Sequence, residues 1–468
     1  MRLWNEWFRC VRQLRPSCSR SRSFLWLVLA LAALSTRLDL AGVTSFVRIL
    51  GLAPCSYRRL LHLFHCPAVK LDSLTSLWSS LALKLFTPFT AGGYLVCLAD
   101  GLKTPKEGRK MPAVRSLHQS ADSNSKPPFI MGHSFQAVSL LVRGPGGHVG
   151  AVPLVARIHE GLVWSNRDQR TLLDRMVEMF YSAARPFERK VILVADAYYA
   201  SRKVIVPLLE GGHHLVTRAR INSVAYLPVE PVAKRRRGRP RVYGGKIHLR
   251  SLFEESSLML SAFSPIPGES HLKIRYGCFN LLWRPVGREV RFVVVAHPVR
   301  GSIILMTSDA EMDPLDVIVL YFHRFKIETG FRHAIHVLGV YAYHFWMEAM
   351  TPIRRRSGEQ HLHMKSEEYR NNVRRKLNAY HLYVQLGCIA QGLLLHLAVN
   401  HGAIVWDSFR SWLRTMDPSR PPSELVVASS LREELPEFLE RGGHHEQLRK
   451  LVAAYRRSDE ATPIRKAG

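Results

Sequence analysis

Two short apolar runs in this chain end in the same way, with an aspartate. The first is Tyr94–Asp100 (YLVCLAD) and the second is Val191–Asp196 (VILVAD). Short apolar runs of this kind are typical of buried strands, and a carboxylate at the end of such a strand needs water or a cation as a partner. If the two strands are neighbours, both carboxylates lie at one edge of the sheet. The chain is therefore restricted to folds that bring these two strand ends together.

The segments around the two runs predict a mixed α/β core. Residues 134–142 and 149–158 alternate as strands around a glycine-rich turn, and residues 170–185 and 201–212 have helical patterns, the second ending at a Gly pair. The order is a strand ending in Asp, a hairpin, a helix, a strand ending in Asp and a helix. This is the layout of an RNase H-like fold, with a mixed sheet that holds two Asp side by side.

The charge of the chain favours a polyanion as its partner. There are 66 Lys and Arg against 37 Asp and Glu, a net charge of +29 and a pI near 10.3. Nucleic acid is the commonest such partner, and a membrane surface is the competing interpretation.

A strongly basic run lies inside a β-rich segment over residues 213–307. The run is KRRRGRPR at 234–241, and its Gly-Arg-Pro centre is typical of an arginine hook that enters the DNA minor groove. The competing interpretation is a solvated loop. The arginines that we expect to contact DNA here are Arg235, Arg236, Arg237, Arg239 and Arg241.

The N-terminal segment combines arginines with the apolar run Phe24–Leu34, which is the outline of a signal peptide. The run is too short to span a bilayer and continues into Arg37 and Asp39 without a clear cleavage site. A wrongly chosen start codon is a third interpretation. We expect a helix of a folded N-terminal region in a cytoplasmic protein, with no membrane association.

Two amphipathic helices follow, over residues 43–50 and 57–64, with Gly51 ending the first and Ser56 capping the second. They could form a helix-turn-helix whose Arg58 and Arg59 contact DNA. The alternative is two packed helices with a solvated basic face.

Cysteine and histidine give no metal signature. The seven cysteines are scattered without C-x-x-C pairs, which argues against a disulfide framework and a thiolate zinc site. The His-rich stretches carry no second ligand pair at zinc-like spacing, so we expect surface or core histidines in a reducing compartment.

A third acidic residue stands in YFHRFKIETGFRH, residues 321–333. On a helix, Tyr321, Arg324 and Glu328 fall within about 60° of one another and share a face. Taken alone, Arg324 and Glu328 could be an ordinary i, i+4 ion pair. Together with Asp100 and Asp196, Glu328 completes a set of three carboxylates that can hold two divalent ions, Mg²⁺ or Mn²⁺, for phosphodiester chemistry.

With these residues in place, the sequence resembles the DDE transposases of bacterial insertion sequences, in the cut-and-paste group with a β-strand insertion and a Tyr-x2-Arg-x3-Glu-x6-Lys signature. The resemblance covers residues 98–346 and rests on the segments around Asp100, Asp196 and Glu328. It implies that these three are the catalytic, metal-binding triad, and that Tyr321 and Arg324 contact DNA phosphate. The chain departs from the signature at Ile335, where Lys is expected, which puts the handling of the strand ends in doubt.

The predicted function is that of a Mg²⁺-dependent transposase, which cleaves the ends of its element and joins the 3′ hydroxyl to target DNA. Double-stranded DNA is the partner, and the resemblance implies a homodimer in the synaptic complex. The alternatives are an RNase H-like DNA nuclease without strand transfer and an inactive, transposon-derived DNA-binding protein. The expected regions are a helical DNA-binding region over 1–88, the RNase H-like core over 89–212 and 308–400, the β-rich insertion over 213–307, and a helical C-terminal region over 401–468.

Overall fold

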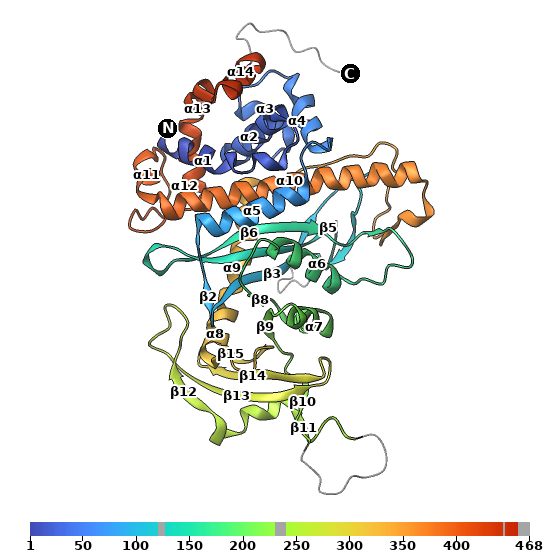
Figure 1. Cartoon of the computed structure of the whole chain (residues 1–468), viewed down its shortest axis with the longest axis vertical. Helices are drawn as coiled ribbons and strands as arrows, with labels where there is room; N and C mark the ends of the chain where they lie inside the picture. The colour runs from blue at the N-terminus through green and yellow to red at the C-terminus, as the bar shows by residue number, and fades with distance from the viewer. Residues whose placement is uncertain (120–126, 230–239, 443–444, 457–468) are drawn as a thin grey trace.

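A computed structural model describes residues 1–119, 127–229, 240–442 and 445–456 of the chain (Figure 1). A large mixed sheet occupies the middle and lower part of the view, and helices from both ends of the chain gather above it. The fold is mixed α/β and RNase H-like, with helical N-terminal and C-terminal regions, as the sequence predicts.

Within the described residues the main sheet has 14 strands, and its central path runs β1-β5-β3-β8-β9-β15-β14-β13-β10-β11. Strands β3, β8 and β9 are parallel neighbours, whereas β5 and β15 flank them in antiparallel orientation. The strands are β1 Thr87–Pro88, β2 Thr90–Ala91, β3 Tyr94–Pro105, β4 Arg115–His118, β5 Phe129–Arg143, β6 Val149–Ile158, β8 Val191–Val194, β9 His214–Arg218, β10 Val224–Tyr226, β11 Lys246–His248, β12 Leu260–Phe263, β13 Lys273–Trp283, β14 Arg288–His297 and β15 Gly301–Thr307.

The strands after β9 extend the core sheet itself, because β15 pairs directly with β9. The inserted strands β13, β14 and β15 then follow as one antiparallel meander. A separate two-stranded parallel sheet joins β7 (Leu162–Val163) to β16 (Gln360–His361).

The two faces of the central strands belong to different cores, as the two-residue period of a strand requires. On one face Leu95, Cys97 and Ala99 pack with α6 (Leu172–Ala184) and α7 (Arg202–Glu210). On the other face the side chains at 96, 98, 192, 194 and 216 pack with α8 (Pro314–His323) and the start of α9 (Phe325–His333). Any polar residue that continues the second set of positions therefore faces α8 and α9.

A long helix, α10 (Glu367–Asn400), lies between the sheet and most of the terminal helices, whereas α5 (Leu71–Leu85) contacts β6 directly (Figure 1). Among the described residues it is the one helix whose length and composition would let it cross a membrane, and its apolar stretch is entirely buried in the protein. Residues 379–399 of this helix are buried on all sides, because β6 packs on one side and α2 on another.

The helices that cover α10 come from both ends of the chain. The apolar run Phe24–Leu34 forms the middle of a buried helix, as expected of a folded N-terminal region. The terminal helices are α1 Arg2–Arg12, α2 Ser21–Thr36, α3 Val43–Ile49, α4 Ser56–His65, α5 Leu71–Leu85, α11 Gly402–Ser408, α12 Glu424–Glu433, α13 Leu435–Arg441 and α14 Glu446–Tyr455.

Two local expectations for these regions are wrong. Ser56 does not cap α4: it is the first helical residue, Cys55 is the N-cap, and the buried Ser56 hydroxyl makes no side-chain cap hydrogen bond. The segment 409–415 is not helical, because α11 ends at Ser408, and its Trp412 is 77% exposed.

One buried cation connects the N-terminal region to the helix that carries Glu328. After α9 the chain makes a π-helical turn, Ala334–Leu338, which ends at Gly339 in the left-handed conformation. Arg37 is 3% exposed, and its guanidinium donates to the carbonyl oxygens of Leu338 and Gly339 at the end of this turn. It also donates to the carbonyl oxygen of Gly42. The turn after the helix that carries Glu328 is thus held by a residue 301 positions earlier in the chain.

Candidate active site

The register of the three parallel strands places polar residues in one row at their carboxyl ends. Leu98 of β3 lies opposite Val194 of β8, which lies opposite Val216 of β9. Two residues further on, at the same level and on the same face, come Asp100, Asp196 and Arg218. We call these three residues the carboxyl-end row. Because this face of the three strands packs against α8 and α9, the row lies next to the helix that carries Glu328.

Asp100 is the most enclosed carboxylate of the site, with a side chain 16% exposed. Its Oδ1 accepts a hydrogen bond from the backbone N–H of Gly101 at 2.7 Å, and its Oδ2 accepts one from Arg324 Nη1 at 2.9 Å. Burial raises the pKa of Asp100 to about 6, since the lowering by Arg324 and Gly101 does not outweigh it, and the charges of Asp196 and Glu328 raise it further. The site therefore places a carboxylate where a further cation would be stabilising.

Asp196 begins a short 3-10 helix, Ala197–Tyr199, and caps it. Its Oδ1 accepts a hydrogen bond from the backbone N–H of Tyr198 at 3.0 Å, and its carbonyl oxygen accepts one from Thr217 Oγ1 at 2.6 Å. The cap uses one carboxylate oxygen and fixes the side chain at the strand end.

Tyr321, Arg324 and Glu328 lie at the junction of α8 and α9, and their side chains meet as the helical spacing predicts. Arg324 Nη2 donates to Glu328 Oε1 at 2.6 Å, and the guanidinium carbon lies 5.9 Å from the centre of the Tyr321 ring. Burial alone would lower the pKa of Arg324, but Asp100 and Glu328 raise it above its ordinary value. One guanidinium thus bridges the carboxylates of the sheet and the helix.

The donor set suits hard divalent cations. Three carboxylates from two strand ends and one helix supply oxygen ligands, which Mg²⁺ and Mn²⁺ prefer over sulfur or nitrogen. The raised pKa of Asp100 reflects a buried acidic site with too little positive charge of its own. The oxygen donors of Asp100, Asp196 and Glu328 suit such ions in kind, and Arg324 lies between Asp100 and Glu328 in this structure. Bound ions would supply Lewis-acid stabilisation of phosphodiester oxygens.

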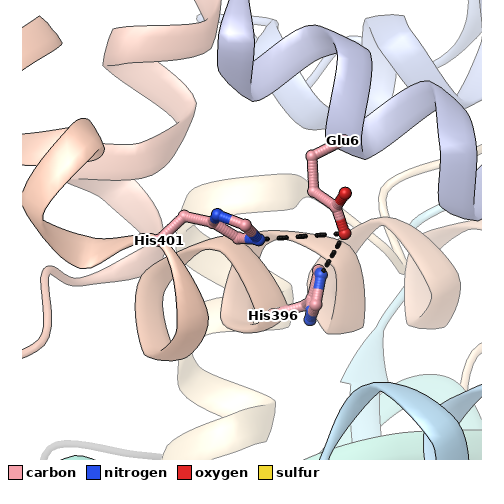
Figure 2. Close-up of side chains that lie close together, drawn as sticks. All are labelled: Glu6, His396 and His401. Carbon is pink, nitrogen blue, oxygen red and sulfur yellow. Dashed lines mark hydrogen bonds and ion pairs between the residues drawn. The ribbon is translucent and has the colours of Figure 1, made fainter.

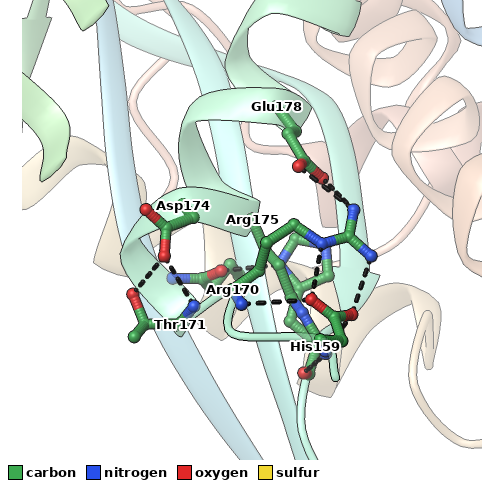
Figure 3. A network of polar contacts seen from close by, with 8 residues as sticks. His159, Arg170, Thr171, Asp174, Arg175 and Glu178 are labelled. Carbon is green, nitrogen blue, oxygen red and sulfur yellow. Dashed lines mark hydrogen bonds and ion pairs between the residues drawn. The ribbon is translucent and has the colours of Figure 1, made fainter. Parts of the chain in front are cut away.

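A polar network supports the sheet behind the row. Tyr199, 2% exposed, receives a hydrogen bond on its hydroxyl from Gln136 Nε2 at 3.3 Å, and Gln136 lies opposite Gly101 in the register. The side-chain oxygen of Gln136 accepts a hydrogen bond from His159 Nδ1. Burial lowers the pKa of His159 to about 3, so its ring is neutral. The outer end of this network is a group of side chains around the start of α6, formed by Asp168, Arg170, Arg175 and Glu178 (Figure 3).

Of the residues predicted to contact DNA, Tyr321 and Arg324 belong to this site, and the others lie in other segments of the chain. Arg58 and Arg59 are exposed on α4, which lies on the far side of α10 from the sheet (Figure 1). Arg241 is exposed in the chain before β11. Four arginines of the basic run, Arg235, Arg236, Arg237 and Arg239, lie outside the described residues.

Ile335 cannot take the place of the expected Lys. It lies in the π-helical turn and packs, half-buried, against the main hydrophobic core. Arg332 and His336 beside it are exposed, so positive charge is available on this helix at other positions.

The sequence reasoning missed Arg218 and Tyr199. Arg218 completes the carboxyl-end row, and its charge acts on the half-buried Tyr321, whose pKa is raised mainly by desolvation. The signal was present in the HLVTR run, which ends in a charged residue as the two aspartate runs do. It was missed because nothing in the sequence shows that β9 follows β8 in parallel.

The fold and the three carboxylates together define a class: RNase H-like enzymes that cleave phosphodiesters with divalent metal ions. A family model described as DDE superfamily endonuclease matches residues 13–257, more than half of the chain, and includes Asp100 and Asp196 but ends before Glu328. The protein belongs to this family of DDE endonucleases, which act on DNA and use divalent metal ions. No curated protein matches the sequence.

Proposed function

We propose that the protein is a transposase that cleaves the ends of its insertion sequence and joins the 3′ hydroxyl to target DNA. The observation that carries this proposal is the convergence of Asp100, Asp196 and Glu328, with Arg324 linking sheet and helix through hydrogen bonds of 2.9 and 2.6 Å. The Tyr-x2-Arg-x3-Glu signature of cut-and-paste transposases supports the finer assignment over a general nuclease.

In this proposal the three carboxylates are the catalytic residues and hold two Mg²⁺ or Mn²⁺ ions. When bound, the ions stabilise the attacking and leaving oxygens of an in-line displacement. Arg324, Tyr321 and Arg218 position the scissile phosphate, since all three present donors beside the acidic residues. The enclosed position of Asp100 keeps one ligand away from bulk water, which strengthens its electrostatic interactions.

DNA binding outside the site is assigned to basic surfaces. The net charge of +29 attracts duplex DNA over the whole chain, and Arg58 and Arg59 form an exposed basic face on α4. The arginines of the run at 234–241 are assigned to the minor groove. A homodimer in the synaptic complex, and action on the bacterial nucleoid in the cytoplasm, belong to the same proposal.

The test is cleavage of labelled DNA that carries the sequences flanking the gene, with Mg²⁺ or Mn²⁺, by the wild type and by Glu328→Gln. Removal of one ligand charge is expected to lower the cleavage rate by several powers of ten, roughly the scale of metal catalysis, while DNA binding is retained. Glu311→Gln, an exposed carboxylate just before α8, is the matched control and should cleave as the wild type does.

The products separate the alternatives. Nicks at the element ends followed by joining to a target plasmid support the transposase. Nicks without joining under any divalent ion would show an RNase H-like nuclease. Binding without cleavage by the wild type would show a transposon-derived DNA-binding protein.

A further inference from the structure

A second cluster of metal-ligating atoms lies where the N-terminal helix meets the end of α10 (Figure 2). Glu6 projects from α1 toward His396 of α10 and His401, the residue between α10 and α11. Their ligand atoms all lie within 4.8 Å of one another, a closeness not reached by the three acidic residues of the active site, between which Arg324 is placed.

Several groups converge on one oxygen of this cluster. Glu6 Oε1 lies 2.9 Å from His396 Nε2 and 3.8 Å from His401 Nε2. It is also 2.6 Å from Arg9 Nη2 and 3.6 Å from Cys10 Sγ. Arg9, His396 and Cys10 lie at hydrogen-bond distance from this oxygen, which has two lone pairs, whereas His401 lies beyond that distance. Two imidazole nitrogens and a carboxylate oxygen gathered within 4.8 Å of one another are an arrangement that a metal ion can bridge.

A cation already lies beside Glu6 in this cluster, since the Arg9 guanidinium donates to both carboxylate oxygens. Arg9 is 61% exposed and can turn into solvent when a cation replaces it. The cluster therefore exchanges one positive charge for another.

We propose that Glu6, His396 and His401 bind a zinc ion, with the Cys10 thiolate as the fourth ligand. Two imidazoles, a carboxylate and a thiolate form a tetrahedral set that zinc accepts, whereas Mg²⁺ prefers oxygen ligands. Cys10 is fully buried beside Glu6, and its S–H proton is released to solvent when the sulfur–zinc bond forms. The ion would fasten α1 to the junction of α10 and α11, so its role is structural and separate from cleavage.

The test is metal content and spectroscopy of the full-length protein. After dialysis with excess Mg²⁺ to occupy the acidic site, the wild type is expected to retain one zinc ion per chain. Substitution by Co²⁺ should give the intense visible bands of a tetrahedral site and a sulfur-to-cobalt band in the near ultraviolet. Cys10→Ser should lose the ultraviolet band.

The variants make the assignment specific. His401→Gln, at a position with a side chain 29% exposed, should weaken zinc binding at least about 10-fold, the minimum that loss of an outer-shell partner alone costs. His271→Gln, an exposed histidine of the insertion, is the matched control and should bind as the wild type does. Circular dichroism of the zinc-free variants checks that each remains folded.

Two results would overturn the proposal: equal zinc affinity in wild type and His401→Gln, or a Co²⁺ spectrum of octahedral form. Either would show that the cluster is an ion-pair network only, centred on Arg9 and Glu6. Because cleavage is measured separately with Mg²⁺, failure of this proposal would leave the proposed function untouched.

Discussion

Replacement of Arg37 by Ala should destabilise the protein although the residue lies outside the acidic site. Leu338 O would lose both donors that Arg37 supplies, whereas Gly339 O keeps the N–H of Ala342 and Gly42 O keeps Ser45 Oγ. One orphaned buried carbonyl costs about 1–3 kcal/mol, and each lost charge-assisted hydrogen bond adds about 1 kcal/mol.

The cavity left between the aromatic rings beside the guanidinium brings the total to about 3–5 kcal/mol. Urea unfolding followed by circular dichroism measures this difference. Because the same carbonyls end the turn after α9, cleavage activity is expected to fall at temperatures where the variant is still folded.

The matched control is Arg48→Ala on the neighbouring helix, where the arginine is 58% exposed and pairs with Asp39 at 2.9 Å. An exposed pair of this kind contributes about 0–1 kcal/mol. A loss below about 1 kcal/mol in Arg37→Ala, similar to the control, would refute the reasoning that a buried cation holds the turn after the helix that carries Glu328.

Two further predictions concern charge. Arg218→Gln should lower the rate of DNA cleavage by about 10–100-fold with DNA affinity nearly unchanged. The control Arg220→Gln, at an exposed position two residues later, should cleave as the wild type does. Equal cleavage rates in the two variants would remove Arg218 from the site. Hydrogen bonding to Glu424 raises the pKa of His333, so this pair stabilises the fold below the unfolded pKa of about 6.5 and loses its effect as pH rises through the folded value. Glu424→Gln should therefore cost about 1 kcal/mol at pH 6 and less at pH 8 in urea unfolding, while the exposed control Glu437→Gln should show no such pH dependence; a cost independent of pH would contradict the assignment.

The sequence predicts the order of the core elements well, because it shows clearly both the apolar runs of strands and the 3.6-residue period of helices. The runs ending at Asp100 and Asp196 are apolar enough to be strands, and their shared ending implies adjacency. The helical spacing of Tyr321, Arg324 and Glu328 needs only local geometry, so their contact was also predictable.

Long-range pairing could not be read in the same way. That β15 pairs with β9, and so joins the inserted strands to the core sheet, depends on contacts between segments far apart in sequence. The same holds for Arg218, whose place beside Asp196 follows from the register of β8 and β9. Glu6 and His396 are 390 residues apart, so spacing rules for metal ligands cannot connect them.

The burial of α10 on all sides has a consequence for how the chain can be shortened. Its apolar stretch carries enough hydropathy to enter a bilayer, and helices from the first 85 residues supply part of its cover. Removal of those helices would expose the apolar side chains of α10 to water along much of its length. Fragments that begin near β3 should therefore aggregate or bind to lipid. The N-terminal helices thus keep the apolar surface of α10 out of water.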